Sequence, residues 1–172
     1  MTNPTWTGHP SLVDTIEALN DPADDPEQRR RTMSVLRKYW AAVLGQDADS
    51  LRPLYSEDVV GELPFSESGR VEEGHFRSFR GIDDVMAFWA TAFSLEGEDS
   101  ALYDAEVNMT SDGRVVFVEG FGQVTMASGR DYRNRYVFRL TLDGDKVTSF
   151  REYYNPITAA YAFGRDIALG GD

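Results

Sequence analysis

The sequence lacks one residue type and several functional motifs, and each absence excludes a class of function. It contains no cysteine, which excludes disulfides, thiol nucleophiles and cysteine-based zinc sites. The two histidines, His9 near the start and His75 in a polar stretch, are too few and too far apart for a metal site. Neither a glycine-rich phosphate loop nor a nucleophile elbow is present. We therefore expect no metal and no other cofactor.

Basic residues and long apolar runs are also scarce. Lys and Arg number 17 against 29 Asp and Glu, so the formal net charge is −12, which argues against nucleic-acid and anionic-membrane partners. No apolar run approaches the ~18 residues of a membrane-spanning helix. The first residues lack the basic and then apolar pattern of a signal peptide. We therefore expect a soluble, cytoplasmic protein.

The 172 residues, 41% of them hydrophobic, are most simply one domain with a packed core. We divide the chain into an N-terminal extension, residues 1–24, and a folded domain, residues 25–172. Ser11 and Asp14 resemble a capping box and predict a short helix through Leu19. The extension has two interpretations: a flexible arm, or a segment laid over a partner subunit.

Helices are predicted mainly in the first half of the domain. Asp25 as N-cap and Pro26 at the first position begin a long helix, and Gly45 ends it. A short helix is predicted over about 50–55 after a cap at Asp49. A further long helix begins at Gly81, and a last one covers about 157–163.

Strands are predicted mainly in the second half, where apolar residues recur with period two. Asp112-Gly113, Ser128-Gly129 and Asp143-Gly144 are hairpin-turn signals and predict an antiparallel meander. An earlier strand, 59–65, ends near Pro64 and is placed at an edge or an end of the sheet; 69–80 is expected to be a polar loop. The meander strands are predicted near 100–110, 114–126, 131–142 and 146–155. The fold class is α+β, with helices on one face of a curved antiparallel sheet.

The last predicted strand carries the first candidate for chemistry. Alternation places Thr148, Phe150, Glu152 and Tyr154 on one face, and Val147, Ser149, Arg151 and Tyr153 on the other. Both faces are bulky, which is typical of a central strand covered on both sides. A carboxylate between aromatics is costly to bury unless it is paired, protonated or used. Glu152 is therefore either a catalytic acid/base or an ordinary glutamate bonded to a neighbour.

Neighbouring strands indicate which face holds a pocket. Gly120 and Gly122 alternate on one face and predict a hollow there, or simply a bend in the sheet. Matching polarity places Asn134, Tyr136 and Phe138 beside them, on the face of Glu152.

The opposite face combines aromatic residues with charges, and this mixture suits a subunit interface. Glu119 lies within cross-strand reach of arginines and is interpreted as paired and structural. We therefore expect a homodimer through this outer face. Its other residues are Phe117, Phe121, Arg135, Arg139, Arg151 and Tyr153.

The order of elements and several short motifs resemble the nuclear transport factor 2-like superfamily, including the SnoaL-like proteins. The motifs are ELPF at 62–65, RGIDD at 80–84, Asn134-x-Tyr136 and REYYNP at 151–156, and the resemblance covers residues 26 to about 164. It implies a cone-shaped α+β barrel. The pattern Val118-Glu119-x-x-Gly122, Asn134 and 151–156 is most similar to the phenazine-biosynthesis A/B proteins.

The resemblance also implies roles for single residues. The last-strand glutamate of the phenazine proteins is a pocket acid/base and corresponds to Glu152, whereas their pocket histidine falls near Phe88 and is missing here. Limonene-epoxide hydrolases have an Arg and an Asp where this chain has Gly120 and Gly122, which argues against their reaction. Those hydrolases and ketosteroid isomerases place a polar functional residue near Glu62, which makes it the expected second pocket acid.

Two functions are compatible with these residues. The first is cofactor-free acid/base chemistry on a carbonyl-containing intermediate of secondary metabolism: isomerisation, cyclisation, dehydration or condensation. The second is a non-catalytic ligand-binding or scaffold protein of the same fold. For the first, Glu62 and Glu152 exchange protons and Tyr154 binds the substrate oxygen. The expected pocket lining is Asn134, Tyr136, Phe138, Gly120, Gly122, Trp89, Phe88, Tyr39 and Trp40.

Overall fold

The structure is a computed structural model, and it describes residues 12–18, 23–65, 69–70, 72 and 74–166. Its helices and strands follow the predicted alternation of a helical first half and a stranded second half. In chain order they are α1 (Leu12–Glu17), α2 (Pro26–Leu44), α3 (Ala48–Leu51), a 3-10 turn (Arg52–Leu54), β1 (Tyr55–Leu63), β2 (Arg77–Arg80), α4 (Ile82–Leu95), β3 (Ala101–Met109), β4 (Val115–Thr125), β5 (Asp131–Asp143), β6 (Lys146–Tyr154) and α5 (Pro156–Phe163).

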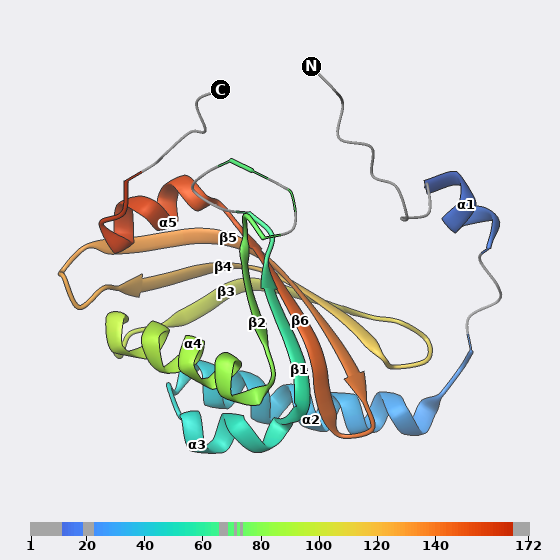
Figure 1. The fold of residues 1–172 in the computed structure, drawn as a ribbon. Helices are drawn as coiled ribbons and strands as arrows, with labels where there is room; N and C mark the ends of the chain where they lie inside the picture. Colours follow the sequence, from blue (N-terminus) through green and yellow to red (C-terminus); the bar gives the residue numbers. More distant parts are fainter. Residues whose placement is uncertain (1–11, 19–22, 66–68, 71, 73, 167–172) are drawn as a thin grey trace.

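The six strands form one curved sheet in the order β2-β1-β6-β5-β4-β3. Only β1 and β6 pair in parallel; the other neighbours are antiparallel. The helices α2, α3 and α4 lie across one face, and α5 packs near one end of β5 (Figure 1). The predicted α+β class is confirmed, although the sheet stays open and does not close into a barrel.

The long helix α2 begins and ends where its caps predict. The Asp25 side chain accepts a bond of 2.9 Å from the backbone N–H of Gln28, and Pro26 occupies the first turn. Gly45 follows the last residue and donates its N–H to Ala41. The predicted cap of the next helix was wrong by two residues, because Asp47 and not Asp49 accepts from Ser50.

The meander β3–β6 has nearly the predicted bounds. The glycines of its three turns, Gly113, Gly129 and Gly144, have φ of 71°, 80° and 58°. This left-handed conformation costs glycine little, which explains why these dipeptides mark the turns.

The short strand β2 lies inside the segment that was predicted to be a polar loop. β2 pairs with β1, so β1 is second from the sheet edge. Pro64 directly follows Leu63, the last residue of β1. The helix α1 confirms the short N-terminal helix, and its predicted end at Leu19 falls outside the described residues.

The strand β6 occupies the central place predicted for it, between β1 and β5. A register irregularity near Thr141 and Leu142 turns Val147 inward, and Val147 is fully buried, against the simple alternation. The outer face of β6 is open in a single chain, since 45% of the Arg151 side chain is exposed. The expectation of cover on both faces was therefore wrong for the isolated chain.

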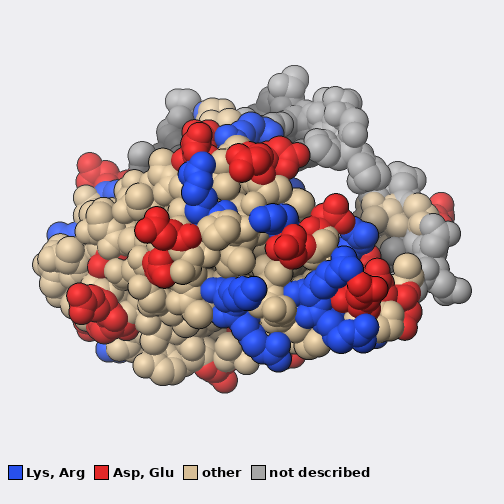
Figure 2. Space-filling view, turned by 90° about the horizontal axis from the view of Figure 1, so that it is seen from below, with Lys and Arg blue, Asp and Glu red and all other residues tan. Residues whose placement is uncertain are grey.

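The exterior is strongly charged. Acidic and basic side chains are interspersed over the face seen from below, where α2 and α3 lie (Figure 2). Such mixing is typical of a solvated surface. Among the described residues, no helix is long and apolar enough to cross a membrane.

Candidate active site

A cavity lies between the concave face of the sheet and the helices α2 and α4. Its volume is about 110 Å³, counted as the space that the centres of water molecules can occupy. A single water needs about 10–15 Å³ on this measure, so the cavity has room for a small organic molecule. Its wall is mainly aromatic, with contributions from Trp40, Phe88, Trp89, Tyr136 and Phe138.

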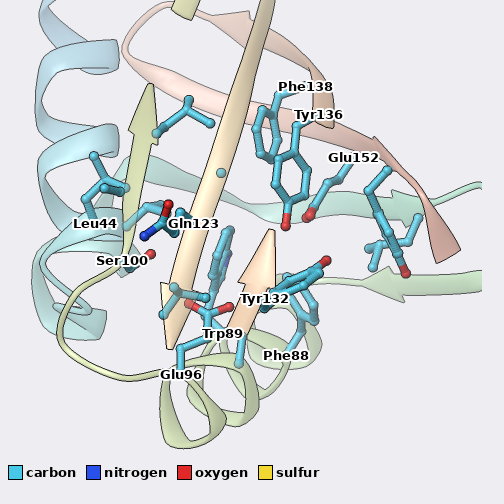
Figure 3. A pocket seen from close by; sticks show the side chains of 18 of the residues that line it. Leu44, Phe88, Trp89, Glu96, Ser100, Gln123, Tyr132, Tyr136, Phe138 and Glu152 are labelled. Carbon is cyan, nitrogen blue, oxygen red and sulfur yellow. The ribbon is translucent and has the colours of Figure 1, made fainter. Parts of the chain in front are cut away.

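Glu152 projects from the middle of β6 into this cavity. Its strand partner on β5 is Phe138, and its carboxyl group points toward the hydroxyl groups of Tyr132 and Tyr136 (Figure 3). Burial raises the pKa of Glu152 to about 8; the nearby carboxyl of Glu96 adds to the rise, and Arg77 opposes it. In the part of the chain that the structure describes, no group forms a hydrogen bond or ion pair with the Glu152 carboxyl. Glu152 is therefore a buried carboxyl group without a hydrogen-bond or ion-pair partner among the described residues, and its pKa lies close to neutral pH.

Glu96 is the second acid of the cavity, and the sequence did not indicate it. It follows the last residue of α4, and an isolated bridge to Met126 fixes its backbone. Burial raises the pKa of Glu96 to about 7. Figure 3 shows its carboxyl beside Trp89, at a different part of the cavity from Glu152. Two carboxyl groups from different layers of the fold therefore face one enclosed space.

Tyrosine hydroxyls surround the Glu152 end of the cavity. The rings of Tyr132 and Tyr136 pack edge to face with centroids 6.5 Å apart, and Asn134 donates to the Tyr132 hydroxyl over 3.1 Å. Burial raises the pKa of both tyrosines, and the charge of Glu152 adds to this effect. Both hydroxyls stay protonated at neutral pH and can donate to a substrate oxygen.

Comparison of the chain with models of known protein families identifies its family. A model of the SnoaL-like domain matches residues 36–150. The chain belongs to the SnoaL-like domain family. This confirms the resemblance seen in the sequence motifs.

Solved structures agree with this SnoaL-like fold. A phenazine biosynthesis-related protein from Pseudomonas aeruginosa is 22% identical, with a TM-score of 0.66 over 85% of this chain and 93% of that one. An NTF2-like protein from Burkholderia xenovorans is 24% identical, with a TM-score of 0.62 over 78% and 96%. A steroid delta-isomerase from Pseudomonas aeruginosa is 17% identical, with a TM-score of 0.58 over 84% and 90%. At these identities the likeness establishes the fold alone.

The structure corrects the predicted second acid of this SnoaL-like domain. Glu62 lies on the outer face of the sheet, where it accepts a bond of 2.6 Å from Nε of Arg151. The residues of β1 that point inward are Val59, Gly61 and Leu63, all buried. Glu62 alternates with them and therefore points away from the cavity.

The two strand glycines do not leave the predicted hollow. A Cβ on Gly122 would lie 2.5 Å from Cε2 of Tyr136, and one on Gly120 would lie 2.9 Å from the side chain of Leu102. These neighbours already occupy the space above the glycines. Gly122 still lines the cavity, but Gly120 does not. The missing side chains of Gly120 and Gly122 leave room for Leu102 and Tyr136 and not for a ligand.

Two other predicted lining residues have structural roles. Asn134 is buried outside the cavity lining, where it donates to the carbonyl of Asn155 over 3.0 Å and accepts from the Asn155 N–H over 2.9 Å. Tyr39 lies behind the cavity wall, and its hydroxyl is 3.0 Å from that of Tyr55. Trp89 donates to the same Tyr55 hydroxyl over 2.8 Å. These bonds hold the wall in place.

The structure brings the remaining predicted residues together at the cavity. They are Glu152, Tyr154, Tyr136, Phe138, Trp89, Phe88 and Trp40. Sequence reasoning missed several polar lining residues, of which Arg77 lies in the segment expected to be a loop and Ser100, Gln123 and Tyr132 lie in predicted strands. The missed residues are Arg77, Glu96, Ser100, Gln123, Tyr132 and Arg165.

The outer face of the sheet departs from one further expectation. Glu119 has no ion pair with any described arginine, and its direct cross-strand neighbour on β3 is another acid, Glu106. Arg135 instead pairs with Asp104 over 3.3 Å.

Within the described residues no cluster of three metal-ligating side chains occurs.

Proposed function

We propose that this SnoaL-like domain is a small-molecule enzyme. It performs cofactor-free acid/base chemistry on a carbonyl-containing intermediate of secondary metabolism, by isomerisation, cyclisation, dehydration or condensation. The observation that supports this most strongly is Glu152, an unpaired carboxyl group in an aromatic cavity with a pKa near 8. A group with a pKa close to the working pH is the best compromise between donating and accepting a proton.

Glu152 serves as the proton carrier. Its ionised form takes a proton from the carbon next to a substrate carbonyl, and the electron pair of the broken C–H bond moves onto the carbonyl oxygen. Tyr132, Tyr136 and Tyr154 surround the place where this oxygen gains charge, and hydroxyl donors there stabilise an enolate. Glu152 then returns the proton to a different carbon, which completes an isomerisation, or to a leaving hydroxyl, which completes a dehydration.

The names of the structural neighbours fit this reaction class. One is a phenazine biosynthesis-related protein and another a steroid delta-isomerase. Such names support a biosynthetic isomerase or cyclase but do not specify its substrate, because one fold serves many functions.

The proposal is tested by proton exchange, which needs no knowledge of the natural substrate. Small β-dicarbonyl compounds and β,γ-unsaturated ketones are incubated with the protein in D2O, and loss of the α-proton signal is followed by NMR. Glu152→Gln is expected to lower the exchange rate by about 10²–10⁴-fold. Glu119→Gln, the same change on the outer sheet face, is expected to keep the wild-type rate. Equal rates for wild type and Glu152→Gln would rule out the proposed role.

A second candidate function is non-catalytic binding of a small ligand. Phe88 favours it, because this aromatic residue lines the cavity at the position for which the family resemblance implied a histidine, and no described histidine lines the cavity. A ligand that co-purifies with the protein and is released unchanged, together with no exchange by any compound in the panel, would favour binding over catalysis.

We further propose that the outer sheet face forms a homodimer interface. Tyr103 on β3, which pairs with Phe121, is 57% exposed, and Phe117 on β4 is 38% exposed. Aromatic residues on an open sheet face are typical of subunit contacts. Light scattering at micromolar concentration is expected to give a dimer mass, and Tyr103→Glu to give a monomer. A monomeric wild-type protein would contradict this assembly.

A further inference from the structure

Arg77 places a cationic group at the cavity. It is the first residue of β2, and its side chain is half-buried in the cavity wall. The guanidinium carbon lies 5.6 Å from the ring centroid of Phe79 and 5.5 Å from that of Phe88. These cation–π contacts hold the guanidinium beside the aromatic wall without using its N–H donors in hydrogen bonds.

The guanidinium has no polar partner among the described residues. No hydrogen bond and no ion pair joins it to them, whereas Arg114 and Arg151 each bond a carboxylate. The contrast is informative because the chain has 12 more acidic than basic residues, so carboxylates are abundant. An arginine presents five N–H donors in a fork that matches a carboxylate. At Arg77 this fork remains available to a ligand.

The charges that face the cavity also favour an anion. Burial keeps the Glu152 carboxyl mostly protonated at pH 7, because its pKa is about 8, and leaves Glu96 about half ionised. Arg77 lines the same cavity and carries the positive charge of a guanidinium group. Arg77 therefore places a positive charge beside two acids that burial makes harder to ionise, although the whole chain carries −12.

We infer that Arg77 binds an anionic group, a carboxylate, on the ligand of this cavity. The aromatic wall formed by Trp40, Phe88, Trp89 and Phe138 selects the rest of the ligand as flat and apolar. The substrate class is therefore a small, planar carboxylic acid that also carries the reacting carbonyl group. The second half of this statement depends on the proposed function, whereas the binding of the carboxylate does not.

The inference is tested by comparing acids with their neutral amides. Benzoate, cinnamate and 2-naphthoate, and the matching benzamide, cinnamamide and 2-naphthamide, are titrated at pH 7 with binding followed by NMR or calorimetry. Wild-type protein is expected to bind at least one acid about tenfold or more tightly than its amide, since a charge-assisted bidentate bond is roughly twice as strong as a neutral one.

Variants on one strand locate the effect. Arg77→Leu is expected to remove the preference for the acid and to leave amide binding unchanged, and Arg77→Lys to keep part of it. Arg80→Leu is the matched control, because Arg80 also lies on β2 but is exposed and does not line the cavity. Circular dichroism melts verify that each variant is folded. Glu152→Gln is expected to lose proton exchange but keep acid binding, which separates this inference from the proposed function.

Three results would overturn the inference. The first is a wild-type protein that binds no acid of the panel, and the second is one that binds acids and amides equally. The third is an Arg77→Leu variant with the same preference as wild type. An Arg77→Lys variant with no preference, together with an unchanged Arg80→Leu, supports recognition by the guanidinium fork rather than by charge alone.

Discussion

Replacing Glu152 with Gln is expected to make the domain more stable, and increasingly so as the pH rises. The pKa of Glu152 is about 8 in the folded chain against an ordinary value of 4.5. Between these values the folded state holds a proton that the unfolded state has released, so the unfolded state is favoured as the pH increases. The stability of the wild-type protein therefore declines from about pH 4.5 to about pH 8, and the decline is complete above pH 8.

The size of the effect follows from the same two values. At ~1.36 kcal/mol per pH unit, the full difference is about 5 kcal/mol; linkage gives about 1 kcal/mol at pH 5 and about 4 kcal/mol at pH 8. This is a large share of the roughly 5–15 kcal/mol that stabilises a typical domain. Gln has nearly the same shape and cannot ionise, so it removes this contribution. Glu96, whose pKa is also raised, leaves a smaller residual slope.

The assay is urea unfolding followed by circular dichroism at pH 5, 6, 7, 8 and 9. The stability difference between Glu152→Gln and wild type should grow by about 3 kcal/mol from pH 5 to pH 8, with equal m-values. Glu119→Gln, on the outer face, should follow the wild-type curve. If Glu152→Gln shows the same pH dependence as wild type, the Glu152 carboxyl is hydrated in the folded protein, and the reasoning from burial is refuted.

Three further predictions concern other parts of the cavity. Glu96→Gln is expected to lower the pKa of Glu152, because it removes a neighbouring negative charge; a ¹³C NMR titration of the Glu152 carboxyl measures this, and an unchanged pKa would contradict the coupling. Gly122→Ala is expected to cost about 1–3 kcal/mol in urea unfolding, because its Cβ would meet the ring of Tyr136 at 2.5 Å; a neutral effect would show that the ring moves freely. Asn134→Ala is expected to cost about 1–3 kcal/mol for each partner left unbonded, while the acid-over-amide preference persists; loss of that preference in a folded variant would place Asn134 at the ligand.

Most of the fold was predictable because its signals are local. Asp25 and Pro26 define a helix start by geometry that involves only a few residues. The turn glycines at 113, 129 and 144 define the hairpins in the same way. The strand β2 was missed because its four residues, RSFR, are too few for a periodic pattern. They pair with β1, which ends 14 residues earlier, and no tight-turn signal joins the two strands.

The candidate site was predicted less completely, because it depends on orientation and on contacts between distant segments. Glu152 was found because a single acid between aromatics stands out within one strand. Glu62 was placed on the wrong face because its position was taken from the resemblance, and a shift of one residue along a strand exchanges the two faces. Its neighbour Gly61 points inward, and the ring of Phe150 occupies the space beside it. Glu96 follows a helix end in an acidic stretch, so its sequence resembles a solvated turn, and contacts with a distant segment, such as the bridge to Met126, fix it beside the cavity.

The two cavity acids come from different layers, one from the end of α4 and one from the centre of the sheet, and burial is the main cause of both raised pKa values. Their acidity is therefore a property of the tertiary packing rather than of either side chain. Packing changes that admitted bulk water to the cavity would therefore lower both pKa values toward those of an exposed glutamate. Core residues that do not line the cavity thus help to set the acidity of the two groups that do.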